Sequence, residues 1–133
     1  NREDMWTSNF STKGATFKWL QQLIKIRKTY VALRRGSAPV FRFTEKQAGI
    51  LAFERTYKHP SKDQEQTVLV VFNTDNETPR ETTRDGQAME TNFPANFELS
   101  DALTNEVFTT DAMGRLSLQL TPNSVRILVP KTP

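Results

Sequence analysis

Residues 16–30 read TFKWLQQLIKIRKTY and decide how the rest of the chain must be arranged. Their apolar side chains recur every three or four residues, and a helical projection places all of them within an arc of roughly 180°. The pattern predicts an amphipathic helix with Thr16 as its N-cap, and Gly36 ends the basic tail that follows. The apolar residues are Phe17, Trp19, Leu20, Leu23, Ile24, Ile26 and Tyr30.

An apolar face of this width is more than a helix needs to lie on one small sheet. A helix that is apolar over half its circumference normally packs between two neighbours. The sequence contains no second clear helix, so one neighbour is expected to lie outside these 133 residues. The chain also begins at Asn1 rather than at methionine, which we interpret as the boundary of a piece of a longer protein.

Arg27 falls within the same apolar arc. An unpaired buried charge costs several kcal/mol, roughly, so its guanidinium must reach solvent, a carboxylate or backbone carbonyls. We therefore expect Arg27 to be a structural anchor between the helix and its neighbour rather than a ligand-binding residue.

After Pro39 the apolar period changes from helical to two, which is typical of strands. Residues 41–44 and 51–57 alternate on either side of a turn and predict a hairpin. Residues 68–72, VLVVF, are apolar without alternation, as in a central strand covered on both faces. Burying those five side chains supplies on the order of 10 kcal/mol in gross terms.

The remaining strands are expected to be short. Residues 74–96 predict one or two short strands with long connections, and further strands are expected near 106–109, 116–120 and 125–129. Residues 111–114 and 121–124 carry turn chemistry. Short strands with frequent turns are typical of an antiparallel sandwich or barrel.

The composition narrows the possible chemistry. The chain has no cysteine and a single histidine, which excludes disulfides, thiolate sites and metal sites of His/Cys spacing. No stretch approaches the ~20 apolar residues that a bilayer requires, so we expect a soluble chain. The composition does not assign it to a cellular compartment.

The net charge is +3, with basic residues gathered in the first third. We interpret that cluster as a solvated helix face complementing the helix dipole, rather than as a nucleic-acid surface. It comprises Lys18, Lys25, Arg27, Lys28, Arg34 and Arg35.

No constellation of catalytic residues is visible. His59 lies in a polar segment before Pro60, where a solvated loop histidine is expected. The carboxylates also lie in polar surroundings, without the apolar context that raises a pKa for acid catalysis. We expect each of the following to be a solvated charge: Glu3, Asp4, Asp63, Glu65, Asp75, Glu77, Glu81 and Asp85.

Several segments, in order, resemble the end of the alpha-amylase superfamily, glycoside hydrolase family 13. Residues 1–6, NREDMW, resemble the stretch after the eighth barrel strand, and 23–28 with 32–37 resemble the closing barrel helix and its exit. Residues 68–73, VLVVFN, resemble a strand of the C-terminal domain C, and 116–129 resemble its last hairpin. The sequence departs from the family pattern at Val31 and Asn123, and residues 74–96 match poorly.

The resemblance implies a mainly β fold, an antiparallel Greek-key β-sandwich like amylase domain C, preceded by one long N-terminal α-helix. Residues 1–36 would be the leader and the final helix of a missing (β/α)8 barrel, and 37–133 the sandwich. The parent would act on α-1,4-glucans with an aspartate nucleophile, a glutamate acid/base and a second aspartate, all on earlier barrel strands. This fragment is then expected to be a non-catalytic domain without metal or cofactor. Arg2 and Trp6 would border the parent's cleft, and Arg27 would tether barrel to sandwich.

Other functions remain open from the sequence. An independent starch-binding module would need coplanar exposed aromatic side chains, and the candidates are Trp6, Trp19, Tyr30 and Tyr57. A small nucleic-acid-binding protein ranks below both readings, since the β portion has no basic strand rich in aromatics. If the helix has lost its barrel, its exposed face is expected to be covered by another molecule, as in self-association, or by the leader.

Overall fold

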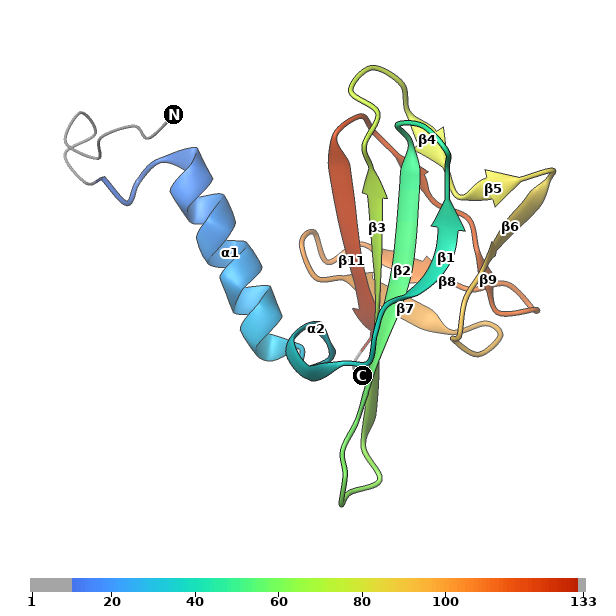
Figure 1. The fold of residues 1–133 in the computed structure, drawn as a ribbon, viewed down its shortest axis with the longest axis horizontal. Coiled ribbons are helices and arrows are strands. Elements are labelled where there is room, and N and C mark those ends of the chain that lie inside the picture. The colour runs from blue at the N-terminus through green and yellow to red at the C-terminus, as the bar shows by residue number, and fades with distance from the viewer. Residues whose placement is uncertain (1–10, 132–133) are drawn as a thin grey trace.

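A computed structural model describes residues 11–131, which form a helical arm followed by a β-rich body (Figure 1). The elements in chain order are α1 (Ala15–Thr29), α2 (Ala32–Arg35), β1 (Val40–Thr44), β2 (Ile50–Lys58), β3 (Glu65–Asn73), β4 (Arg80–Glu81), β5 (Thr83–Arg84), β6 (Gln87–Glu90), β7 (Glu98–Asp101), β8 (Val107–Thr109), β9 (Arg115–Leu116), β10 (Gln119–Leu120) and β11 (Ser124–Pro130).

The largest sheet has six antiparallel strands in the order β1-β2-β3-β11-β7-β8. Strand β3 lies at its centre, between β2 and β11. Leu69 and Val71 point into one apolar cluster, whereas Val68 and Val70 point into another on the opposite face. The predicted central strand, covered on both faces, is confirmed.

Two small sheets, β10-β4 and β5-β6-β9, cover one face of the large sheet (Figure 1). Between the layers lies the main core, to which the small sheets contribute Met89, Leu116 and Leu120. The last strand, β11, returns to pair between β3 and β7 after the chain has built the small sheets. The expected antiparallel β fold with one main helix is therefore confirmed.

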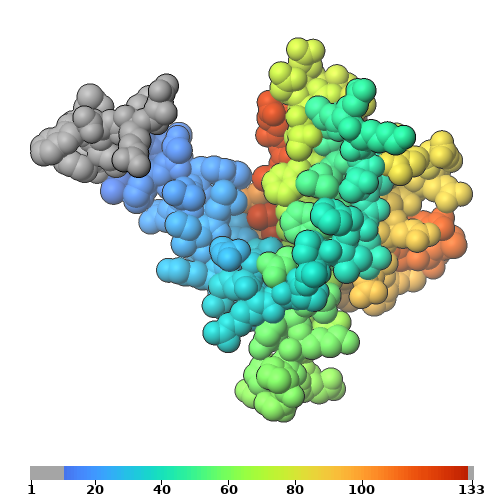
Figure 2. Space-filling view, in the orientation of Figure 1, coloured from blue at the N-terminus to red at the C-terminus, as the bar shows by residue number. Residues whose placement is uncertain are grey.

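The helices cover part of the other face. Ile26 of α1 and Ala32 of α2 are buried in a second cluster against Val68, Val70 and Ile127. Helix α1 meets the sheet only through its C-terminal half, and its N-terminal half leans away from the body (Figures 1 and 2). In the described part of the chain, no helix combines the length and apolarity needed to cross a bilayer.

The start of α1 differs from the prediction. The N-cap is Gly14 and makes no side-chain capping bond, while Thr16 lies inside the helix. Thr16 as N-cap is therefore wrong. The helix ends at Thr29, and the extended backbone of Tyr30 leads into the short helix α2, whose C-cap is Gly36.

The second layer also differs in detail. Residues 74–96 contain three short strands, not one or two, and β5 and β6 form a hairpin around Asp85-Gly86, both at positive φ. The strand predicted over 116–120 is split into β9 and β10. It breaks because the buried hydroxyl of Thr82 enters the ladder, donating to Leu116 O and accepting the Leu118 N–H. Leu116, Leu118 and Leu120 all remain buried, as their alternation predicts.

Candidate functional site

The most prominent surface feature is the row of apolar side chains that α1 leaves uncovered. Phe17, Trp19, Leu20 and Ile24 are 41%, 45%, 55% and 45% exposed, whereas Ile26 is 6% exposed. We call Phe17, Leu20 and Ile24 the α1 stripe, because spacings of three and four residues place them on one side of the helix. The sequence-based expectation that the sandwich cannot cover this wide face agrees with these exposures.

Hydrogen bonds fix the position of the helices against the sandwich. Gln22 donates through Nε2 to the carbonyl of Leu103 at 3.2 Å, and the Ala32 N–H donates to Gln66 Oε1 at 3.0 Å. These bonds join α1 to the turn between β7 and β8, and α2 to strand β3. The C-terminal half of α1 is therefore docked by specific contacts, even though its N-terminal half is exposed.

Two arginines share a carbonyl where the helices join the sheet. Arg27 Nη1 donates to Leu33 O at 2.7 Å, so it uses one of the options expected for it, a backbone carbonyl. Arg55 of β2 donates to Leu33, Gly36 and Ser37 carbonyls, which binds the end of α2 to the sheet. Sequence analysis missed Arg55, because only the fold brings it to α2. The role of Arg27 as a tether to a barrel stays a prediction.

The face of the large sheet that α1 contacts also carries aromatic side chains that the helix leaves partly uncovered. Arg27 continues the row of Leu20 and Ile24, and it meets the same carbonyl as Arg55 of β2. On that face of the sheet, Phe53 and Phe72 are half-buried, with ring centroids 6.4 Å apart. Exposed Phe41 continues the row, 6.2 Å from Phe53. The outer side of α1 and this face of the sheet thus both carry apolar side chains that are not fully buried.

Charge is distributed unevenly along the chain. Residues 11–44 contain eight lysines and arginines and no aspartate or glutamate. Seven of these cations form no ion pair with a carboxylate among residues 11–131; the eighth, Arg42, pairs with Glu54. The seven are Lys13, Lys18, Lys25, Arg27, Lys28, Arg34 and Arg35.

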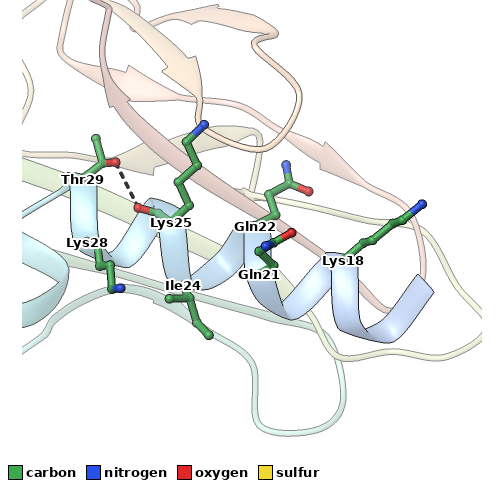
Figure 3. Close-up of a pocket in the computed structure, with 7 residues that line it drawn as sticks. All are labelled: Lys18, Gln21, Gln22, Ile24, Lys25, Lys28 and Thr29. Atoms are coloured by element: carbon green, nitrogen blue, oxygen red, sulfur yellow. Dashed lines mark hydrogen bonds between the residues drawn. The ribbon is translucent and has the colours of Figure 1, made fainter. Parts of the chain in front are cut away.

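A shallow hollow runs along α1 (Figure 3). Lys25 and Gln22 point to one side of the helix, and Ile24 and Lys28 point to the other. Lys18, Gln21 and Thr29 complete the lining, and Thr29 Oγ1 donates to the Lys25 carbonyl. The hollow is open and its lining holds neither a carboxylate nor a histidine, so it does not have the residues of an acid–base site.

Among residues 11–131 three carboxylates are buried, each held by donors of the protein itself, and two of them are Glu54 and Asp101. Glu54 bonds to Arg42 and to the Asn92 N–H. Asp101 is fully buried and pairs with Arg126. Their oxygens are occupied by structural partners, so these residues stabilise the fold. Neither was singled out in the sequence, since their burial depends on contacts between distant strands.

The expectation of a solvated charge is wrong for Asp75, which is buried and pairs with Arg80 at 2.7 Å. Glu65 and Glu81 are exposed as expected, although they lie in strands β3 and β4. The N–H groups of Glu77 and Thr78 donate to Asp75 Oδ1. The Glu77 N–H, then Arg80 and the Thr78 N–H, lower the pKa of Asp75 from 3.8 to about 2.

This shift predicts an acid-dependent loss of stability. Because the folded pKa lies below the unfolded one, Asp75 contributes stability above pH 3.8 that disappears as the pH falls to about 2. Urea unfolding across that range is expected to give the wild type a larger free energy of unfolding than Asp75→Asn at higher pH. This gap between the two proteins should close on acidification. A gap that stays constant with pH would contradict this assignment.

The remaining candidates give little chemistry. His59 lies beside β2 and accepts a hydrogen bond from the Ser61 N–H, as a loop histidine does. Residues 11–131 hold no cluster of three or more potential metal ligands. Arg2 and Trp6 lie outside the described residues. Of the other aromatic candidates, Tyr30 and Tyr57 are half-buried against the second cluster, and only Trp19 is exposed.

Two solved structures share this fold. An alpha-amylase from Anoxybacillus, described as giving insights into a new glycosyl hydrolase subclass, aligns over 88% of this chain with 19% identity and a TM-score of 0.62. The alpha-amylase of Geobacillus thermoleovorans, solved in complex with acarbose, aligns over 86% with 18% identity and a TM-score of 0.67. The matching fold is that of their C-terminal β domain.

The likeness is limited to a part of those enzymes. The alignments cover 23% and 22% of their lengths, so this chain spans less than a quarter of either. No family model and no curated protein matches the sequence. At this level of identity, the structural comparison establishes the fold.

Proposed function

We propose that this chain is the non-catalytic C-terminal region of an alpha-amylase-type glycoside hydrolase acting on α-1,4-glucans such as starch and maltooligosaccharides. The uncovered α1 stripe carries the proposal, since a helix with this exposure needs a second partner and the shared fold belongs to alpha-amylases. Residues 1–36 would complete a (β/α)8 barrel, and 37–133 would form the sandwich that stabilises and shields it.

The energetic reason for such a domain lies in the stripe. Transferring a side chain such as Leu20 or Ile24 from water into an apolar interface contributes about 1.5–3 kcal/mol each. The same contacts would cover apolar surface on the barrel. Arg27 then stands at the junction as a tether, and Arg2 and Trp6 lie at the rim of the parent's cleft.

Comparing three chains in one assay tests the proposal. The natural chain extended upstream should cleave maltoheptaose, and the 133-residue chain should not. A version of the extended chain that ends at residue 36, and therefore lacks the sandwich, should lose activity faster on heating. If the extended chain encodes no barrel, or heat inactivation is unchanged by the deletion, the proposed role is wrong.

The alternative is an independent starch-binding module, and exposed Trp19 is the observation that favours it. Tyr30 and Tyr57 pack against the second cluster instead of forming a platform with Trp19. Native electrophoresis of the 133-residue chain through soluble starch is therefore expected to show no retardation. Retardation that is lost on Trp19→Ala, but kept on the matched Phe41→Ala, would favour the module.

A further inference from the structure

The charge of the helical arm is opposite to that of the sandwich. The arm, residues 11–36, carries seven cations and no anion, whereas residues 37–131 carry ten cations and thirteen anions, a difference of −3. The arm has therefore accumulated positive charge in a chain whose overall charge is only +3. Helix dipole complementarity accounts for Arg27 and Lys28 in the last turn of α1, but not for Lys13 or Lys18.

The cations lie beside the stripe and around it. Lys28 and Ile24 point to the same side of α1, whereas Lys25 points to the other side (Figure 3). Arg27 follows the stripe toward α2, where it donates to Leu33 O. Arg34 and Arg35 follow at the exposed end of α2. An apolar stripe bordered by cations fits a surface with an apolar centre and a negatively charged rim.

We propose that the surface covering α1 is a folded protein surface with an apolar centre and a rim of aspartate and glutamate side chains. It would belong to the barrel that precedes this chain in the longer protein, so the inference rests on the proposed function. The rim would pair with Lys28 and Arg27 beside the stripe, and would extend to Lys25, which precedes Lys28 by three residues and is therefore its neighbour on the helix surface. Attraction of this kind fixes the orientation of two surfaces more than it adds affinity.

A folded element fits the site better than an anionic membrane. A basic amphipathic helix is also typical of membrane-surface binding, where its apolar face lies flat in the interface. Here the sheet face that α1 contacts carries a second apolar surface, formed by the half-buried Phe53 and Phe72. Because α1 leans away from the body (Figure 1), a convex protein element can contact both apolar surfaces, whereas a flat bilayer reaches only one.

Charge reversal in two chain lengths tests the proposal. Lys25→Glu/Lys28→Glu is the test pair and Lys46→Glu/Lys62→Glu, at exposed sandwich positions, is the control. In the extended natural chain the test pair should lower the melting temperature by about 4 °C or more at low salt. The drop should shrink near 1 M salt, where the Debye length is about 3 Å. In the 133-residue chain both pairs should have similar, smaller effects.

Carbodiimide cross-linking, which joins lysine amines to carboxylates in contact, supplies a second readout. Mass spectrometry of the extended chain should find Lys25 or Lys28 joined to barrel carboxylates. If the melting shifts are equal in both chain lengths and no such cross-link forms, the proposed carboxylate rim is wrong. The proposed function would still stand if the barrel covers α1. Absence of a barrel upstream would overturn both.

Two further outcomes identify other occupants. If the 133-residue chain sediments with phosphatidylserine vesicles, and the Lys25→Glu/Lys28→Glu variant does not, the stripe binds membranes and the proposal is wrong. Cross-linked dimers joining Lys25 or Lys28 to sandwich carboxylates of a second copy, increasing with concentration, would replace it by self-association.

Discussion

Replacing Asp101 by alanine is expected to lower the free energy of unfolding by about 3–5 kcal/mol. The carboxylate is fully buried, and its Oδ1 accepts the N–H groups of Leu103 and Ile127 at 3.0 and 3.2 Å. Its Oδ2 accepts from Arg126 and the Thr104 hydroxyl at 3.1 and 3.0 Å. Alanine leaves one buried and one partly buried N–H group without an acceptor and removes a partner of Arg126, which keeps Glu106.

Glu98→Ala is the matched control, because Glu98 of β7 also forms an ion pair, with Lys131 after the neighbouring strand β11 at 2.9 Å, but both side chains are largely exposed. An exposed pair of this kind contributes about 0–1 kcal/mol. Urea unfolding followed by far-ultraviolet circular dichroism measures both variants. Asp101→Asn should fall between them, since it keeps an acceptor at Oδ1. Similar small losses for Asp101→Ala and Glu98→Ala would show that the buried network is not a major source of stability.

The second large effect is expected at Ile26. Ile26→Ala removes a side chain that is 6% exposed and packed between α1 and the sheet, and such a change costs about 2–5 kcal/mol. Ile24→Ala makes the same chemical change two residues earlier, where the side chain is 45% exposed. In the 133-residue chain it is expected to change stability by no more than about 0.5 kcal/mol.

The comparison separates the docked side of α1 from its uncovered side within one helix. Urea unfolding of the two variants and the wild type provides the measurement. If both variants lose the same free energy, the sandwich or another part of this chain covers Ile24 in solution, and the distinction between the two sides fails.

Much of the fold could be predicted because its signals are local. The apolar run at 68–72 and the alternation at 116–120 reflect burial that each strand needs wherever its partners lie. The helix was equally clear from its spacing. Its start was not, because Gly14 precedes it without a side-chain cap while Thr16 looked like one.

The small sheets were harder to predict for a physical reason. Strands of two residues have no period to detect, and they depend on contacts such as that of Thr82 with residues 116–118. One signal was available and was not used: Asp85-Gly86 is the turn dipeptide that favours a two-residue hairpin, and it occupies that place between β5 and β6.

In the candidate site, too, local features could be predicted and contacts between distant strands could not. The width of the apolar face on α1 could be inferred from residues 16–30 alone. The buried partners Glu54 and Asp101, and the binding of α2 by Arg55, could not, because each depends on strands that are distant in sequence. The positive charge of the arm was visible in the sequence. Only the structure places it beside an exposed apolar stripe, and this position indicates a role in binding.

The most direct test of the missing partner is Ile24→Ala measured in two chain lengths. In the 133-residue chain the free energy of unfolding should stay within about 0.5 kcal/mol of the wild type. In the extended natural chain the same substitution should cost about 2 kcal/mol or more, since Ile24 would then be buried in an interface. A loss that is equally small in both chains would contradict the account, because the stripe would then face solvent in the longer protein as well.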